Sequence, residues 1–259
     1  MEILFLIMTG ALIGLIVGIT GVGGGALMTP ALLLFGFPAH IAIGTDLWFA
    51  ALTKSGGMYA HHRKGHVNWQ IALSLSCGSL PGAIITGLVL AFWFQSPEHY
   101  ASILQTALGA MLILTSTVLL FRKYLSRLYS GSGMPTDILL PKSRIQLTLT
   151  GFVLGVLVTL SSVGAGAIGT AVLMILFPTL LPKNIVGTDI AHAVPLTIVA
   201  GLVHLYLNNV NFMLLISLLC GSLPAIYFGT ALSSKVPAKL LQPILATTLM
   251  LLGLKYALF

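Results

Sequence analysis

Charged residues are scarce in this chain of 259 residues: 12 are Lys or Arg, 5 are Asp or Glu, and together they make up 7% of the sequence. A soluble domain carries about 25% charged residues. So few charges cannot cover a water-facing surface. The composition therefore argues against a soluble enzyme, a disordered chain or a nucleic-acid-binding domain, despite a net charge of +7. With 57% hydrophobic residues and a mean hydropathy of +1.04, it predicts a polytopic membrane protein that lies in a lipid bilayer.

Other absences narrow the class further. Two cysteines exclude a disulfide scaffold. The first apolar run, Ile3 to Ile19, has no basic segment before it, which favours a membrane segment over a removed signal peptide. The sequence contains no Gly-xxxx-Gly-Lys-Ser/Thr loop for nucleotide binding. No acidic or cysteine ligand completes a zinc set with the histidines at 61, 62 and 66, and we expect neither a metal nor a cofactor.

Long apolar stretches supply the architecture, since a membrane-spanning helix needs about 20 residues. Two stretches, Ile3–Phe37 and Ile145–Leu181, are too long for one span and are interrupted by runs of glycine and hydroxyl residues. Glycine clusters break helices, so each stretch is predicted to be two shorter helices that meet at an unwound turn. The stretches with the length of a single span are Ala39–Ala60, Trp69–Phe94, Tyr100–Phe121, Ile185–Leu207, Phe212–Leu232 and Leu240–Leu258.

The chain also repeats itself. Residues 10–29 match 151–170 at 8 of 20 positions, and residues 44–81 match 187–224 at 14 of 38. The identities are runs of polar and small letters, which apolar composition alone does not produce. They include Gly44-Thr45-Asp46 with Gly187-Thr188-Asp189, and Cys77-Gly78-Ser79-Leu80-Pro81 with Cys220-Gly221-Ser222-Leu223-Pro224. The pattern predicts an all-α protein with two homologous halves, residues 1–121 and 145–259.

The segment between the halves, residues 122–144, is rich in basic residues and is predicted to be a cytoplasmic linker of a multi-pass protein in the cell (inner or plasma) membrane. If each broken stretch is a hairpin that returns to its starting side, ten of the twelve basic residues fall on the cytoplasmic side. If each crosses once, at most eight do. The count favours two oppositely oriented halves, an inverted repeat, and leaves a parallel repeat as the alternative.

These motifs resemble those of the sulfite exporter TauE/SafE family of membrane permeases. The resemblance rests on the run Gly21-Val22-Gly23-Gly24-Gly25 with Leu27 and Pro30, on Pro38, Ala42 and Gly44-Thr45-Asp46, and on the loop Arg63-Lys64-Gly65-His66-Val67-Asn68-Trp69. It implies transport of small sulfur anions such as sulfite, sulfoacetate or other sulfonates. The second half departs from the pattern, with Ser161-Ser162, Ala165 and Ala171 in place of the polar-glycine pair, the middle glycine and the proline.

The two helix breaks are the first candidate binding residues. A helix that starts inside the bilayer presents free N–H groups and a partial positive charge, which together favour an anion. Irregular backbone at that depth is tolerated only where it lines a cavity or is buried in protein. The alternative is close helix packing through small residues. The predicted substrate-binding set at the breaks is Thr20, Gly23, Gly24, Gly25, Thr29, Ser161, Ser162, Gly164, Gly166 and Thr170.

Two acids and one lysine extend this set. Asp46 and Asp189 occur in the same Gly-Thr-Asp context, with Thr45 and Thr188 beside them. Each pair is interpreted either as a helix cap and first turn or as a substrate- or proton-coupling carboxylate, because a charge within the bilayer usually has a partner or a function. Lys54 lies well inside a predicted span, where it either meets an anion or extends to the interface.

The favoured function is a secondary transporter of a small anion, in which the two halves expose a midplane site alternately to each side. Transport is then expected to run on a proton or ion gradient, as facilitated diffusion, or with a separate energising subunit, and a homo-oligomer stays open. One alternative is an intramembrane enzyme that uses Ser161 or Ser162, although no histidine is suitably spaced, and we expect no catalytic residue. The other is a non-transporting subunit of a membrane complex.

Overall fold

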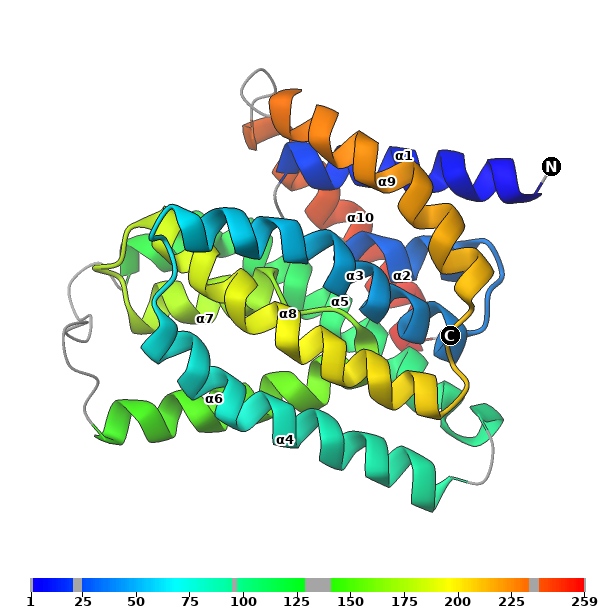
Figure 1. Cartoon of the computed structure of the whole chain (residues 1–259), viewed down its shortest axis with the longest axis horizontal. Coiled ribbons are helices and arrows are strands. Elements are labelled where there is room, and N and C mark those ends of the chain that lie inside the picture. Colours follow the sequence, from blue (N-terminus) through cyan, green and yellow to red (C-terminus); the bar gives the residue numbers. More distant parts are fainter. Residues whose placement is uncertain (1, 21–24, 95–96, 129–140, 233–237, 259) are drawn as a thin grey trace.

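The computed structural model describes residues 2–20, 25–94, 97–128, 141–232 and 238–258, and within these ranges it contains helices and no strand (Figure 1). The all-helical fold predicted from the sequence is confirmed. In chain order the helices are α1 (Glu2–Thr20), α2 (Gly25–Leu34), α3 (Ala39–Arg63), α4 (Trp69–Trp93), α5 (Pro97–Leu128), α6 (Pro141–Ser161), α7 (Ala167–Leu176), α8 (Pro182–Tyr206), α9 (Phe212–Leu232) and α10 (Ala238–Leu258).

Five helices of the described chain are long and apolar enough to cross a membrane: Trp69–Trp93, His99–Phe121, Ser143–Ser161, Pro182–Tyr206 and Phe212–Leu232. Helix α3 has the length but not the hydropathy, since its sequence includes Asp46, Lys54 and the basic end His61-His62-Arg63. Helix α5 continues through Leu128, beyond the point where we expected the linker to begin, and α6 starts before residue 144. Residues 129–140 of the predicted linker lie outside the described residues.

Large apolar side chains cover the outside of the helices. Phe92, Trp93, Tyr206 and Tyr227 are each at least 75% exposed. In water such a surface would aggregate, whereas in a bilayer the acyl chains solvate it and the aromatic rings suit the headgroup region. The arrangement is that of a multi-pass membrane protein.

Glycine faces bring α1 against α9 and α6 against α4. A Cβ at Gly10 of α1 would lie 2.3 Å from the carbonyl oxygen of Leu218, and a Cβ at Gly151 of α6 would lie 2.1 Å from that of Leu75. Without side chains there, the two backbones approach directly, as small residues allow in membrane helices. The two contacts are counterparts in the sequence alignment of the halves, and both join one half to the other.

Helices α3 and α8 pack against each other in opposite directions. Gly44, near the start of α3, lies against Asn209, just beyond the end of α8, and Gly187, near the start of α8, lies against His66, just beyond the end of α3. Helices α5 and α10 are antiparallel as well, because Gly109 approaches Tyr256 while Gly253 approaches Ile113. In each pair the members are counterparts from the two halves.

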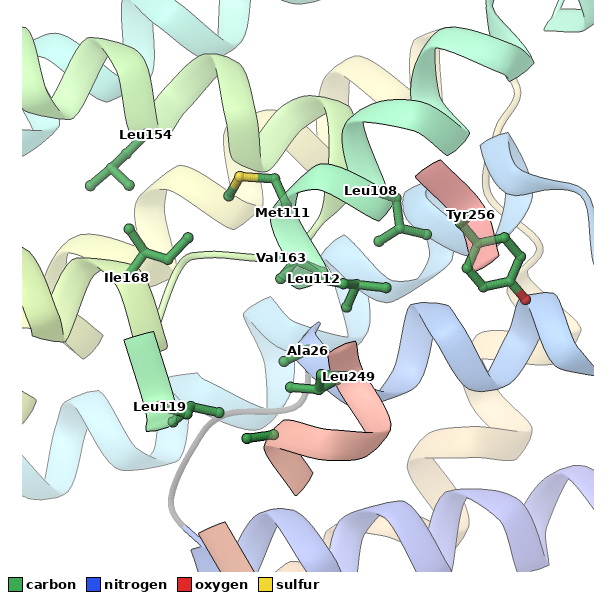
Figure 2. Close-up of a cluster of buried hydrophobic side chains, with 11 residues drawn as sticks. Ala26, Leu108, Met111, Leu112, Leu119, Leu154, Val163, Ile168, Leu249 and Tyr256 are labelled. Atoms are coloured by element: carbon green, nitrogen blue, oxygen red, sulfur yellow. The ribbon is translucent and has the colours of Figure 1, made fainter. Parts of the chain in front are cut away.

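A hydrophobic core surrounds the second helix break and connects the helix pairs described above. Figure 2 shows one cluster, in which Val163 of the break is packed with Leu112 of α5, Ile168 of α7 and Leu249 of α10. Ala26, at the start of α2, belongs to the same cluster. Helices from both halves thus hold the irregular segment in apolar surroundings.

Candidate functional site

The second predicted helix break is present. Helix α6 ends at Ser161, α7 begins at Ala167, and the residues between them are not helical. Ser162 has a φ of 58° and Gly164 a φ of 112°, so the chain turns through the left-handed region twice in three residues. A Cβ at Gly164 would also lie 2.7 Å from Cε of Met111. The backbone conformation therefore favours glycine at this position, whereas the methionine side chain could move aside.

Short-range hydrogen bonds fix the shape of this break. The Ser161 hydroxyl donates to the Leu157 carbonyl at 2.6 Å and accepts from the Val163 N–H at 3.2 Å. The N–H of Gly166 donates to the Gly164 carbonyl at 2.8 Å. The Ser162 hydroxyl is buried and has no hydrogen-bond partner within the described chain. It is thus a polar group that the fold leaves available.

Asp46 lies in the protein interior beside this break. Its side chain is fully buried, and the Thr29 hydroxyl of α2 donates to its Oδ2 at 2.5 Å. The Ser162 side chain faces the same carboxyl group. The other oxygen, Oδ1, has no hydrogen-bond partner among the described residues. A fully buried carboxylate that depends mainly on neutral hydroxyl groups is only partly compensated for the loss of water.

Asp189 occupies the corresponding place on α8. Thr170 of α7 lies 2.8 Å from its Oδ2, and the same hydroxyl also bonds the Gly166 carbonyl at the break. A Cβ at Gly169 would lie 2.1 Å from Asp189 Oδ1, so the carboxylate rests directly on the backbone of α7. Each half therefore joins its short helix to its long one through a Thr–Asp contact.

The capping interpretation of the two Gly-Thr-Asp motifs is wrong. Pro38 precedes α3 and Leu181 precedes α8, and neither position has a side-chain cap. Asp46 lies about two turns inside its helix, beyond the reach of the free N–H groups of the first turn. The capping residues are instead Asn68, which accepts from Ile71 N–H, and Asn211, which accepts from Leu214 N–H.

Lys54 connects the first half to the break of the second. Its ammonium group donates a hydrogen bond to the Ala165 carbonyl and interacts electrostatically with Asp189 and, less strongly, with Asp46. The side chain thus points into the protein, and the interpretation that it extends to the interface is wrong. The equivalent residue, Thr197, bonds the Ala193 carbonyl of its own helix at 2.9 Å, so the site has one lysine rather than two.

Thr45 and Thr188 lie apart from the break contacts. The N–H of Asn211 donates to the Thr45 hydroxyl at 3.1 Å, and the N–H of Asn68 donates to the Thr188 hydroxyl at 2.9 Å. Both hydroxyls thus hold the start of a long helix from the opposite half. Gly23 and Gly24 of the first break lie outside the described residues, and Thr20 and Gly25 are the last residue of α1 and the first of α2.

Two buried histidines on α8 play different parts. Nε2 of His204 pairs with the Thr159 carbonyl at 2.8 Å and its Nδ1 with the Asn209 amide at 3.2 Å, which together require the neutral ring. His192 bonds Ser79 at 2.9 Å through Nε2 and interacts electrostatically with Lys54, while its Nδ1 has no hydrogen-bond partner in the described chain. His192 therefore belongs with the Lys54 group, whereas His204 does not.

The sequence is similar to known membrane proteins over nearly its full length. Residues 6–256 match the family described as sulfite exporter TauE/SafE. The probable membrane transporter protein YjnA of Bacillus subtilis (strain 168) is 35% identical over 253 residues, which cover 96% of this chain and 98% of that protein. The probable membrane transporter protein YdhB of the same organism is 26% identical, with 97% and 98% covered.

The similarity extends to an archaeon. A probable membrane transporter protein of Methanocaldococcus jannaschii is 24% identical over 266 residues, which cover 96% of this chain and 93% of that protein. No solved structure matches the chain.

Proposed function

The chain belongs to the sulfite exporter TauE/SafE family, and from this premise we propose that it is a secondary membrane transporter for a small sulfur oxyanion or organosulfonate, such as sulfite or sulfoacetate. The relatives named as probable membrane transporters match it over nearly its full length, which favours a transporter over an intramembrane enzyme. The serine chemistry of that alternative is disfavoured too, because Ser161 is bonded to the Leu157 carbonyl rather than to a base.

An anionic substrate is inferred from the position of Lys54 at the second break. Its ammonium bonds Ala165, two residues before the first turn of α7. The N-terminus of a helix carries about half a positive charge, and the half-buried ammonium of Lys54 beside it adds a full one. The hydroxyls of Thr170 and Ser162 lie at the same break. An oxyanion with three or four oxygens suits this combination of a cation, hydroxyls and backbone N–H groups.

We further propose that the two halves form an inverted repeat that works by alternating access. In a repeat related by an axis along the membrane normal, counterpart helices point the same way. An axis in the membrane plane reverses them. The antiparallel packing of α3 with α8 and of α5 with α10 supports the second arrangement. The basic residues of segment 122–144 support a cytoplasmic position for the connection between the halves.

Flux through purified protein in liposomes tests the proposal. Counterflow of ³⁵S-labelled sulfite and sulfoacetate is measured against sulfate and chloride, with empty liposomes as the blank. We expect saturable exchange of at least one sulfur anion. Gly56→Ala serves as the matched substitution, because a Cβ at Gly56 meets nothing within 4 Å and the variant should exchange as the wild type does. A folded protein that moves none of these anions would contradict the proposal and favour a non-transporting subunit.

A further inference from the structure

The charges around the second helix break do not balance. Two carboxylates, Asp46 and Asp189, share one ammonium, that of Lys54. With all three ionised, the group carries one excess negative charge in the interior of a membrane protein. An ionised side chain there costs at least about 2.5–3.5 kcal/mol when uncompensated. An anion that binds beside Lys54 increases the excess to two or more.

The two carboxylates are not equally compensated. Asp189 has the stronger interaction with Lys54, the hydroxyl of Thr170, and the backbone of α7 directly against it at Gly169. Asp46 receives a hydrogen bond from Thr29, as Asp189 does from Thr170, but its interaction with Lys54 is the weaker of the two. Asp46 is therefore the carboxylate whose negative charge is less compensated by Lys54.

The surroundings of Oδ1 suit a proton. The Ser162 hydroxyl faces this carboxyl group, is 2% exposed and has no hydrogen-bond partner in the described chain. A proton on the Asp46 carboxyl group turns it into a donor to the Ser162 oxygen, so the contact between the two side chains persists without the negative charge. A hard metal cation needs about six oxygen ligands. One free carboxylate oxygen and one hydroxyl fall well short of that.

Few other ionisable groups face Asp46. Lys54 lies on the same helix, and α8 supplies Asp189 and His192. Helices α2 and α9 and the segment 162–166 contain no charged residue, and the charged residues of α5 are confined to its ends. A proton that arrives with the substrate therefore has Asp46, Asp189 and His192 as its destinations, and of the two carboxylates Asp46 interacts less strongly with Lys54.

We propose that Asp46 is a proton-binding site that is loaded when the anion binds beside Lys54, so that anion and proton cross the membrane together. This proposal rests on the proposed anion transport. The proton restores the charge balance that the anion disturbs. In its transfer the bond between the proton and a buffer acid breaks, the buffer base keeps the electron pair, and an O–H bond forms on the Asp46 carboxylate without any change of oxidation state. Alternating access then moves both species in the same direction.

Calorimetry on the wild-type protein tests this directly. Sulfoacetate is titrated at pH 7 in two buffers of different ionisation enthalpy, and the difference in heat gives the number of protons taken up per anion. Sulfoacetate is chosen because it has no titrating proton near pH 7, whereas sulfite does. We expect uptake of about one proton per anion, unchanged when choline replaces sodium. Binding without proton uptake would overturn the proton coupling but not the proposed anion transport. Binding that depends on sodium would assign the site to a metal cation and would overturn the proton coupling too.

Variants locate the proton. Asp46→Asn is expected to bind sulfoacetate with no proton uptake, while Asp189→Asn, the counterpart in the other half, still takes up about one. In liposomes loaded with a pH-sensitive dye, an imposed anion gradient should move protons through the wild type and not through Asp46→Asn. Undiminished uptake by Asp46→Asn overturns the assignment to this residue. If no sulfur anion binds the wild type, the proposed function fails and the coupling with it; proton-free binding leaves the proposed function intact.

Discussion

The hydroxyl of Thr45 accepts a hydrogen bond from the backbone N–H of Asn211 at 3.1 Å, across the boundary between the two halves. The same bond exists in reverse, from Asn68 to Thr188, at 2.9 Å. Because α3 and α8 are antiparallel, the two bonds lie at opposite ends of this helix pair. Each threonine thus binds the residue that precedes a helix of the opposite half, α9 for Thr45 and α4 for Thr188.

Replacing either threonine by valine should therefore destabilise the fold. Valine keeps the shape of the side chain and leaves the N–H of Asn211 or Asn68 without its partner, at a cost of about 1–3 kcal/mol. We expect Thr45→Val and Thr188→Val each to lower the midpoint of thermal unfolding in detergent. Serine at either position retains the hydroxyl and should restore most of the loss. Valine variants as stable as the serine variants would show that water satisfies the two N–H groups instead.

The glycine contacts between the halves give a second prediction. A Cβ at Gly78 would lie 1.8 Å from the Thr148 carbonyl oxygen, and a Cβ at Gly221 would lie 1.9 Å from that of Ile7. Both meet backbone, which cannot rotate away as a side chain does. Alanine at either glycine should therefore push α4 from α6 or α9 from α1, with a loss of about 1–3 kcal/mol.

Thermal unfolding of Gly78→Ala and Gly221→Ala measures this effect, with Gly56→Ala as the matched control. Gly56 is also inside a helix, but a Cβ there meets nothing within 4 Å. We expect the control to unfold at or above the wild-type temperature, because alanine is the better helix former. Equal behaviour of the three variants would mean that the packed glycine faces contribute little to stability.

Lys54→Met tests the cationic part of the proposed site. Methionine keeps most of the volume and removes the charge, so the Kd of the sulfur anion should rise at least tenfold, which corresponds to about 1.4 kcal/mol. Lys255→Met changes the net charge equally at an exposed position of α10 and should leave the Kd within about twofold. Calorimetric titration of both variants makes the comparison. An unchanged Kd in Lys54→Met removes this residue from the site.

Local patterns predicted the helices well, because each depends on residues close together in the chain. The runs of apolar residues gave the spans, and Gly164 with Gly166 marked the second break, where both have positive φ. The sequence also placed Thr170 and Asp189 in one candidate set, and in the structure the Thr170 hydroxyl lies 2.8 Å from Oδ2 of Asp189. Such contacts within one half follow from the repeat of the motifs.

Contacts between the halves were beyond reach of the sequence. Lys54 meets Ala165, 111 positions away, and nothing in the residues near Lys54 indicates that partner. The two Gly-Thr-Asp motifs were equally consistent with caps, and only the starts of α3 and α8 excluded that reading. The sequence pattern groups Thr45 and Thr188 with the aspartates. Their hydroxyls instead face the opposite half, because neighbouring residues on a helix point about 100° apart.

Gly169 provides the last prediction, since it brings the backbone of α7 against Asp189. A Cβ there would lie 2.1 Å from Oδ1, so Gly169→Ala must displace the carboxylate and separate it from Thr170. The first half has Met28 at the corresponding position, which makes the close approach a feature of the second half alone. We expect Gly169→Ala to insert and fold but to exchange sulfur anions at least tenfold more slowly, because Lys54 loses the better placed of its two carboxylates. Gly57→Ala is the control, as a Cβ there makes only ordinary contact with Ile190 at 3.9 Å. Counterflow in liposomes compares the two variants. If Gly169→Ala exchanges as fast as Gly57→Ala, the position of Asp189 does not govern how the anion is held.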